Sequence, residues 1–249
     1  MGTSTWHTLC DNVRVLGRSL PWIAALAALS ACAPTPEEAE TASETSGQAV
    51  SGSYDDYAAF AARHGSAPRA GQPLVIGIRG RDLAGNVHET RVTETLDDTL
   101  VVLTPDERVV RLAVSTHPWE TTGNVPDVDG DGHGDVGMIR PGKYLAVQRE
   151  ASRDIGGART YHVLTEGGAD RLPGYRNTDH DDAYSAEERE ASDSRGDYLT
   201  AVLFHRGGEG TPPAVGCQVL DADGIRILAR EGGARFDYLL VDANEEEIP

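Results

Sequence analysis

Short runs of branched apolar residues alternate with turn-forming residues from residue 73 onward, a pattern typical of β-strands. The runs lie at 74–78, 99–104, 108–115, 143–148, 160–165, 200–205 and 237–241. Pro105 and Asp106 separate the second run from the third, which predicts a hairpin. Apolar residues at helical spacing predict two short helices, over 54–65 and 222–230. We therefore expect a mainly β domain over residues 54–249, with two short helices and long acidic loops.

The N-terminal residues predict export. Arg14 and Arg18 precede an apolar run at 20–29, which is too short to cross a bilayer of about 30 Å as a helix. The segment Leu29-Ser30-Ala31-Cys32 then resembles the lipobox of bacterial lipoproteins, in which the cysteine receives a diacylglycerol after cleavage. An ordinary secretory signal that is cut near Ala31 is the alternative.

The lipobox resemblance implies a signal peptide over 1–31 and lipidation at Cys32. Residues 32–53 are polar, acidic and almost free of large apolar side chains, so we expect a flexible tether there. Ala33 stands where an aspartate would imply retention at the inner membrane. We therefore expect a protein of the bacterial cell envelope that is anchored by its lipid alone, at the outer membrane and facing the periplasm.

Charge restricts the partners of this chain. The 249 residues carry a formal net charge of −18. Such an excess of carboxylates argues against nucleic acid and anionic lipid headgroups as partners. It fits a protein that binds cations, or one whose charge only maintains solubility.

The first long acidic loop, residues 127–138, has the spacing of a calcium-binding loop. Positions 1, 3, 5 and 9 of an EF-hand-like pattern are occupied by Asp127, Asp129, Asp131 and Asp135. Gly132 fills the sixth position, and Met138 stands where the closing carboxylate is usual. The loop therefore resembles the aspartate-rich loops of thrombospondin type 3 and dockerin-like calcium modules. A solvated acidic turn is the alternative.

The second long acidic loop, residues 177–188, offers a complete set of calcium ligands, with Asp182 at the sixth position in place of glycine. The ligand side chains are Asn177, Asp179, Asp181, Ser185 and Glu188, and the carbonyl of Ala183 completes the set. Ser185 and Glu188 also have the spacing of a capping box that begins a short helix. The two interpretations are compatible, and we expect calcium with a structural role in both loops.

Cys217 is the only free thiol expected in the mature chain, because Cys10 leaves with the signal and Cys32 carries the lipid. His205 lies upstream at the end of an apolar run, and a loop rich in glycine and proline joins the two residues. A thiol and an imidazole are the minimum parts of a cysteine nucleophile. Gly216 allows a tight turn, and it lets a substrate carbonyl approach backbone N–H groups that act as an oxyanion hole. A buried cysteine that packs as a small hydrophobe is the alternative.

Several short motifs resemble those of the L,D-transpeptidase catalytic domain, and more closely those of small bacterial and phage proteins related to it. They are Ile78-Arg79-Gly80, Asp97-Asp98, Ser115 to Pro118, Pro141 to Tyr144, and His205-Arg206 followed by Gly216-Cys217-Gln218-Val219. The resemblance covers roughly residues 73–242. Ala214 and Val215 stand where the family usually has serine and histidine, and Val219 stands where it often has arginine.

The resemblance implies a β-sandwich that acts on peptidoglycan stem peptides, without an organic cofactor. Cys217 would attack the carbonyl of the third stem residue and expel the terminal D-amino acid, and an amine or water would then take the acyl group. His205 would be the base, the backbone at Gly216 would contribute oxyanion donors, and Arg206 would bind a substrate carboxylate. The first alternative is a catalytically silent, calcium-stabilised binding or structural lipoprotein on the same fold. The second is a cysteine hydrolase that acts on another amide.

Overall fold

The computed structural model describes residues 51–150, 158–208 and 214–249. The predicted signal peptide, Cys32 and nearly all of the tether lie outside these ranges. In the described part of the chain, no helix combines the length and apolar character needed to span a membrane.

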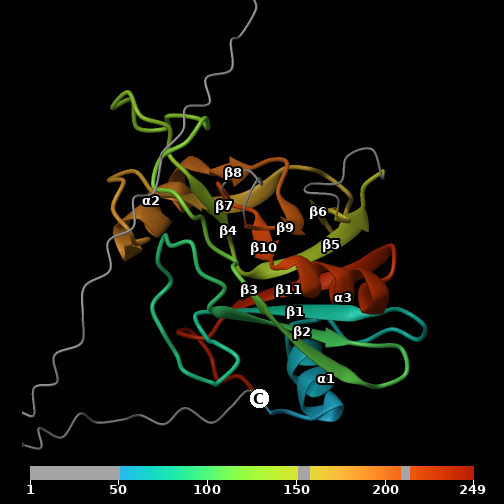
Figure 1. The fold of residues 1–249 in the computed structure, drawn as a ribbon. Coiled ribbons are helices and arrows are strands. Elements are labelled where there is room, and N and C mark those ends of the chain that lie inside the picture. Colours follow the sequence, from blue (N-terminus) through green and yellow to red (C-terminus); the bar gives the residue numbers. More distant parts are fainter. Residues whose placement is uncertain (1–50, 151–157, 209–213) are drawn as a thin grey trace, which may run out of the picture. The chain divides into compact units, whose positions relative to one another are not determined.

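Eight strands form one mixed sheet in the order β10-β9-β6-β5-β11-β1-β2-β3 (Figure 1). Their bounds are β1 (Leu74–Arg79), β2 (Asp98–Leu103), β3 (Val109–Val114), β5 (Gly142–Gln148), β6 (Tyr161–Thr165), β9 (Leu203–Arg206), β10 (Gln218–Leu220) and β11 (Arg235–Asp242). Neighbouring strands pair antiparallel, except that β1 pairs with β11 and β9 with β10 in parallel. At the two edges, Ser115 and Val219 exchange backbone hydrogen bonds of 2.8 and 2.9 Å. The sheet is therefore nearly closed into a barrel.

A smaller sheet has the order β4-β7-β8, formed by β4 (Gly137–Ile139), β7 (Leu172–Arg176) and β8 (Tyr198–Leu199). Helix α2 (Ala186–Arg195) packs against β7. Glycines at 137 and 174 allow the three strands to pack closely, because a Cβ at either position would meet the side chain of Leu199 within 3.0 Å. Pro173 and Gly174 interrupt the apolar pattern of β7, which is why the sequence did not predict this strand.

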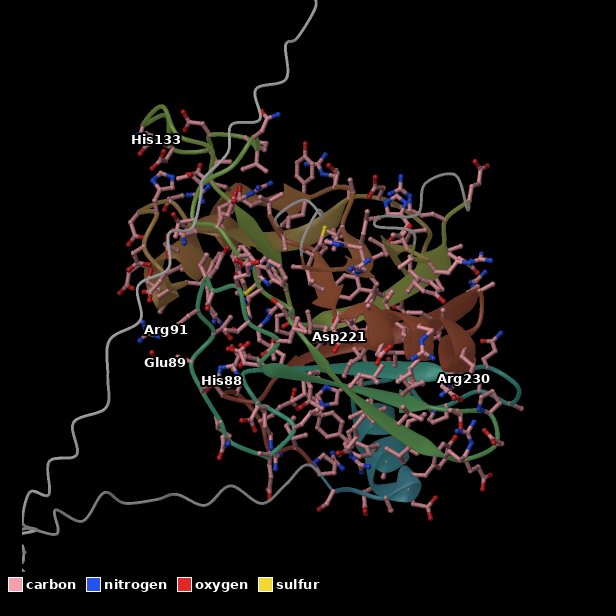
Figure 2. The ribbon with its side chains drawn as sticks, viewed as in Figure 1. His88, Glu89, Arg91, His133, Asp221 and Arg230 are labelled. Carbon is pink, nitrogen blue, oxygen red and sulfur yellow. The ribbon has the colours of Figure 1, made fainter. Side chains whose placement is uncertain are left out.

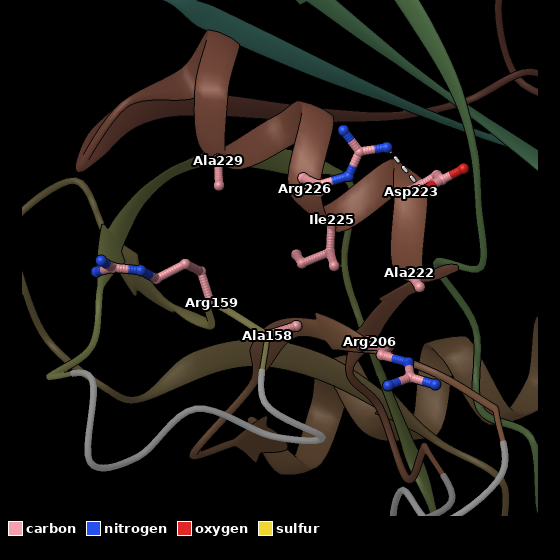
Figure 3. Close-up of a pocket in the computed structure, with 8 residues that line it drawn as sticks. All are labelled: Ala158, Arg159, Arg206, Ala222, Asp223, Ile225, Arg226 and Ala229. Carbon is pink, nitrogen blue, oxygen red and sulfur yellow. Dashed lines mark hydrogen bonds and ion pairs between the residues drawn. The ribbon is translucent and has the colours of Figure 1, made fainter.

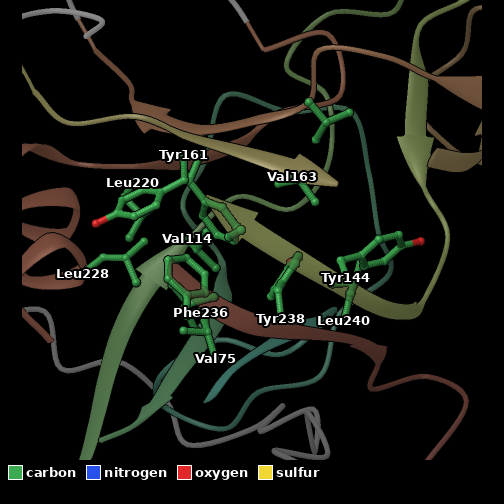
Figure 4. Close-up of a cluster of buried hydrophobic side chains, with 14 of the residues drawn as sticks. Val75, Val114, Tyr144, Tyr161, Val163, Leu220, Leu228, Phe236, Tyr238 and Leu240 are labelled. Carbon is green, nitrogen blue, oxygen red and sulfur yellow. The ribbon is translucent and has the colours of Figure 1, made fainter. Parts of the chain in front are cut away.

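The alternation of side chains along β1 separates two cores. Leu74, Ile76 and Ile78 face helix α1 (Tyr54–Arg63), which covers them with Tyr57, Phe60 and Ala61. Val75 faces the barrel interior, where the rings of Tyr161, Phe204, Phe236 and Tyr238 pack with centroids 4.9 to 5.6 Å apart (Figure 4). Helix α3 (Ala222–Gly232) adds Ile225 and Leu228 to this interior core.

The prediction of a mainly β domain is confirmed. Each predicted run overlaps an observed strand, and β2 and β3 form the predicted hairpin. Both predicted helices are present, and the described residues contain α2 in addition. Helix α2 begins at the capping box that the sequence indicated, with Ser185 as its N-cap and Glu188 as the third residue. The strands that the apolar runs missed, β4, β7, β8 and β10, are all five residues or shorter.

Candidate functional site

Three of the sequence motifs meet in a buried hydrogen-bond network around Asp98. Its Oδ1 accepts from the backbone N–H of Gly80 at 2.7 Å, and its Oδ2 accepts from the N–H and hydroxyl of Thr116 at 2.8 and 2.7 Å. Arg79 donates from Nε to the Thr116 hydroxyl and from Nη2 to the carbonyls of Thr116 and Ile139. The side chains of Arg79, Asp98 and Thr116 are at most 1% exposed. The network therefore fixes the segment that contains Ser115, the residue that bonds to Val219 in β10.

His117 and Asp97 extend this network toward the surface. The Nε2 of the fully buried His117 lies 2.8 Å from Oδ1 of Asp97. Burial alone would lower the pKa of His117, but the hydrogen bond to Asp97 and the charge of Asp98 more than offset it and raise the pKa. Burial alone would raise the pKa of Asp97, but the contact with His117 holds it at about 2. His117 is thus a structural histidine.

Cys217 immediately precedes β10 and borders a cavity of about 390 Å³. The thiol is half-buried. The cavity is lined by Asn124, Val125, Pro126, Arg176, Tyr198, Leu199, Thr200, Ala201, Val202, Val215, Gly216 and Cys217. Burial raises the pKa of the Cys217 thiol to about 11, although a hydrogen bond with the backbone of Leu203 and the charge of Arg149 act in the opposite direction. In this structure the thiol is therefore protonated at neutral pH.

His205 lies on β9, beside the strand that Cys217 enters. The parallel register pairs His205 with Val219, and Phe204, which faces the barrel interior, with Gln218. His205 and Val219 therefore face the outer side of the sheet, and Cys217 lies two residues before Val219. No hydrogen bond links the imidazole to the thiol within the described part of the chain, and His205 is not one of the residues that line the cavity.

The protonation of His205 follows from the hydrogen bond of its ring in the described structure. Nδ1 lies 2.8 Å from the carbonyl of Arg206, which can only accept, so Nδ1 carries the proton and Nε2 keeps its lone pair. Burial lowers the pKa of His205, despite that hydrogen bond. The side chain is 3% exposed, and it is neutral at pH 7.

Position 216 requires glycine because of its backbone conformation and because of the atoms that surround it. Its φ is +125°, and a Cβ there would lie 2.5 Å from the carbonyl oxygen of Gly137 and 2.7 Å from Cδ2 of Leu199. From the sequence we expected this glycine to make room for a substrate carbonyl. Here protein atoms of β4 and β8 fill the space that a side chain would occupy, so the fold by itself explains the glycine.

Arg206 lies in another cavity, of about 430 Å³, between β9 and α3 (Figure 3). Arg159 and Arg226 line the same cavity, and Arg226 is paired with Asp223 at 2.8 Å. Arg206 is absent from the lining of the Cys217 cavity. The structure therefore does not bring Arg206 and Cys217 together.

Arg176 is the charged residue that the structure adds to the Cys217 cavity. It lies on β7, and its Nη1 donates to the carbonyl of Asp135 at 2.9 Å, while Nη2 donates to the carbonyl of Tyr198. Its Nε has no hydrogen-bond partner in the described structure. The sequence held no signal for this residue, because β7 was not predicted.

The first acidic loop gathers three of its four predicted ligands. Carboxylate oxygens of Asp127, Asp129 and Asp135 lie within 4.8 Å of one another. The loop folds back around Asp127, whose oxygens accept from the N–H groups of Gly130 and Gly132 at 2.6 and 3.0 Å. Calcium takes about 6–8 oxygen ligands, so these three carboxylates would supply part of such a set.

The fourth predicted ligand, Asp131, lies outside that group. Its carboxylate accepts from the N–H of His133 at 2.8 Å and lies 3.6 Å from Nδ1 of His180. The Nε2 of His180 lies 3.0 Å from Oδ1 of Asp135, which is fully buried. His180 belongs to the second acidic loop, so it joins the two loops. His133 lies at the tip of the first loop (Figure 2).

The carboxylates predicted as ligands in the second acidic loop, those of Asp179, Asp181 and Glu188, do not come together. Oε1 of Glu188 accepts from the N–H of Thr178 at 2.6 Å, and Oε2 accepts from the N–H of Ser185 at 2.9 Å. Asp179 and Asp181 each accept a backbone N–H two residues further along the chain. The carboxylates of this loop form no such three-residue group within the described structure. Glu188 and Ser185 act here as the capping box of α2.

Asn177, at the start of the second loop, is the exception. It is fully buried, and its Nδ2 donates to the carbonyl of Asp181 at 2.7 Å. Its Oδ1 has no partner in the described structure. Among the predicted ligands of this loop, Oδ1 of Asn177 is therefore the buried oxygen that accepts no hydrogen bond in the described structure.

His88, Asp97 and Asp98 form a second three-residue group that the sequence did not indicate. His88 lies on the connection between β1 and β2 (Figure 2). Its Nε2 lies 2.8 Å from the carbonyl of Asp97, and its Nδ1 lies 3.0 Å from the carbonyl of Glu89. Burial lowers the pKa of His88, but these two carbonyls more than offset it and raise the pKa. Because both ring nitrogens face acceptors, His88 has no lone pair free for a metal.

No family model, curated protein or solved structure matches this chain.

Proposed function

We propose that this protein is a lipoprotein of the bacterial cell envelope, lipidated at Cys32, with a cysteine acyl-transfer domain that acts on peptidoglycan stem peptides. The reaction is of the L,D-transpeptidase or L,D-carboxypeptidase type, and the barrel-like sheet is the family's β-sandwich. The observation that supports this best is the pairing of β9 with β10, because His205 lies on β9 and Cys217 immediately precedes β10. Cys217 also borders a cavity that is large enough for part of a peptide.

The chemistry would divide between these two residues. Sγ of Cys217 forms a bond to the carbonyl carbon of the third stem residue, while Nε2 of His205 takes the thiol proton. The bond to the terminal D-amino acid then breaks, and His205 returns the proton to the departing amine. An acceptor amine, or water, releases the acyl group from sulfur. The neutral state of His205 suits it to accept the first proton.

This mechanism requires a change around the thiol. A pKa of about 11 keeps Cys217 protonated at neutral pH, so the proton must leave as the sulfur attacks. No hydrogen bond joins the two side chains in the described structure, so the imidazole must also approach the thiol. Catalytic hydrogen bonds often form only in the substrate complex.

A second candidate function is a catalytically silent binding or structural lipoprotein on the same fold. The raised pKa of Cys217 and the absence of a hydrogen bond from its thiol to His205 in the described structure favour it. Under this alternative, Cys217 is a packing residue beside a binding cavity.

Turnover of a synthetic tetrapeptide stem by the full chain distinguishes the two candidates. We expect Cys217→Ala to abolish turnover and His205→Gln to reduce it by about 10²–10⁴-fold, the usual contribution of a general base. His162→Gln is the matched control, because His162 lies on the neighbouring strand β6, pairs with Asp170 at 2.8 Å and does not line the cavity. Wild-type protein without turnover would support the silent alternative, and a Cys217→Ala variant with unchanged turnover would exclude Cys217 as the nucleophile.

We also propose that calcium binds the first acidic loop with a structural role. The supporting observation is the group formed by Asp127, Asp129 and Asp135. These residues lie next to Asn124, Val125 and Pro126, which form one wall of the Cys217 cavity. A cation there would hold that wall in place.

A further inference from the structure

Arg176 is a buried cation that has no anionic partner among the described residues. Its side chain is 5% exposed, although it lines the Cys217 cavity. In the described structure, both side-chain hydrogen bonds of Arg176 go to neutral carbonyls, those of Asp135 and Tyr198. No carboxylate of the described residues lies within ion-pair distance of its guanidinium.

The two nearest carboxylates have other partners. Asp135 accepts from His180 and from the N–H of Val128, and Asp197 pairs with Arg195 at 2.8 Å. A buried guanidinium costs several kcal/mol unless a nearby anion compensates it. Burial accordingly lowers the pKa of Arg176, and the distant charges of Asp197 and Asp135 offset this only in part.

The cavity provides the place for such an anion. Apolar walls from Val125, Pro126, Leu199 and Val215 surround it, and its volume of about 390 Å³ suits a small organic ligand. The Nε–H is buried and has no partner in the described structure, and with the second N–H of the adjacent Nη it forms one edge of the guanidinium. That edge matches the two oxygens of a carboxylate.

We propose that the Cys217 cavity binds a ligand with a carboxylate group on an apolar body, and that Arg176 pairs with this carboxylate. This deepens the proposed function, because it names the chemistry that the cavity recognises, and it rests on that function for the natural ligand. Arg176 thereby takes the carboxylate-binding role that the sequence suggested for Arg206. The site itself can be tested without any turnover.

Alkylation of Cys217 by iodoacetate and by iodoacetamide is the first test. In both reactions an S–C bond forms, the C–I bond breaks, iodide leaves with the electron pair, and the thiol proton passes to the buffer. The reagents are similar in size and differ in charge, so the ratio of their rates is independent of the thiol pKa and of access. Mass spectrometry of the Cys217 peptide from the full chain, at pH 9 and 0.15 M salt, measures both rates.

We expect the iodoacetate-to-iodoacetamide ratio in the folded chain to exceed that of the same cysteine in urea by about tenfold, because the guanidinium attracts the anionic reagent. Arg176→Gln should bring the ratio back to the unfolded value. Arg149→Gln is the matched control, since Arg149 also acts on the thiol by its charge but does not line the cavity. That variant should keep the ratio within about twofold of wild type. A ratio equal to that in urea, or one that only Arg149→Gln lowers, would overturn the proposal.

A second measurement needs neither alkylation nor a stable Arg176 variant. Propionate should raise the unfolding temperature of the wild-type full chain in a saturable way, because a ligand that binds only the folded state stabilises it. Propionamide, which lacks the charge, should have no effect at matched ionic strength. Equal effects of the two compounds, or no effect of either, would refute carboxylate binding. Neither result depends on whether stem peptides are turned over, so failure of the proposed enzyme function is recognised separately.

Discussion

Asp98 accepts two hydrogen bonds from Thr116, one from the hydroxyl at 2.7 Å and one from the backbone N–H at 2.8 Å. Thr116 in turn accepts from Arg79, so the three side chains tie β1 and β2 to the segment that follows β3. That segment includes Ser115, whose bond to Val219 holds the edge strand β10. The Asp98 network therefore helps to hold β10, the strand that Cys217 immediately precedes, through the bond between Ser115 and Val219.

Replacement of Asp98 by asparagine should weaken the whole barrel. The amide nitrogen of the new side chain would face N–H and O–H donors, and the buried charge of Arg79 would lose its nearby carboxylate. We expect the free energy of unfolding, measured with urea, to fall by about 3 kcal/mol. Asp106→Asn is the control, because Asp106 is exposed in the β2–β3 turn and pairs with Arg108. Equal losses in the two variants would contradict a role for the network.

Gly216→Ala should destabilise the fold for two separable reasons. The new Cβ would collide with the Gly137 carbonyl and Leu199, and a φ of +125° is strained for alanine. We expect a loss of about 3 kcal/mol in urea unfolding. Gly168→Ala isolates the backbone contribution, since Gly168 has a φ of +83° with nothing within 4 Å of its Cβ position. It should lose about 1 kcal/mol, and a loss as large as that of Gly216→Ala would exclude the collision.

The His117–Asp97 pair should make stability depend on pH. The pKa of His117 is raised in the folded state, so its contribution is fully present below about 6.5 and is lost as pH rises through the folded value. The pKa of Asp97 is lowered to about 2, so its contribution is present above about 3.8 and is lost in acid. Between these limits, at about pH 4 to 6.5, the pair stabilises the protein most.

His117→Gln tests this dependence. We expect the variant to lose more stability relative to wild type at pH 5.5 than at pH 8.5, as measured by urea midpoints. His205→Gln should show the opposite trend, because burial lowers the pKa of His205, and its replacement removes a cost that the wild type bears in acid. The same loss at both pH values for His117→Gln would mean that the pair contributes only through packing.

Calcium should bind the first acidic loop, and its affinity should depend on Asp129. This residue is exposed, and its carboxylate belongs to the group with Asp127 and Asp135. We expect calorimetry of the full chain to show calcium uptake that Asp129→Asn weakens by about tenfold or more, because one charged ligand is lost. Removal of the ion with a chelator should lower the unfolding temperature of wild type and leave that of Asp129→Asn nearly unchanged.

Glu188→Gln provides the contrast in the second loop. Its oxygens accept from Thr178 and Ser185, so the substitution should loosen the start of α2 and cost about 1 kcal/mol without a loss of calcium uptake. Uptake that depends on Glu188 and not on Asp129 would reverse the assignment of the two loops.

The elements that the sequence revealed are those with a strong local pattern. The run at 74–78 alternates between two apolar faces, and each face packs against its own core. The turn at Pro105 and Asp106 joins two strands that are neighbours in the chain, so the hairpin required no distant contact. The capping box of Ser185 and Glu188 is likewise complete within four residues.

The candidate site was only partly accessible from the sequence. Cys217 and His205 were identified from their residue types; His205 lies on β9, and Cys217 immediately precedes the neighbouring strand β10. Arg176 was missed because its strand carries proline and glycine, and its charge matters only where β7 approaches the cavity. Arg206 was favoured because it follows His205 in the chain, but adjacent residues of a strand point to opposite sides, and it lines another cavity.

The sequence by itself determined the mainly β class, the hairpin and the helix starts, because these depend on side-chain period and on hydrogen bonds between near neighbours. The tertiary structure decided which oxygens gather in the acidic loops, which cation lines the Cys217 cavity and how far the pKa of the thiol lies above its usual value. These properties arise from burial and from contacts between segments that are distant in the chain, such as His180 with Asp135 and Ser115 with Val219. The spacing of residues along the chain does not reveal these contacts or the pKa shift of the thiol, because desolvation and charge act through space.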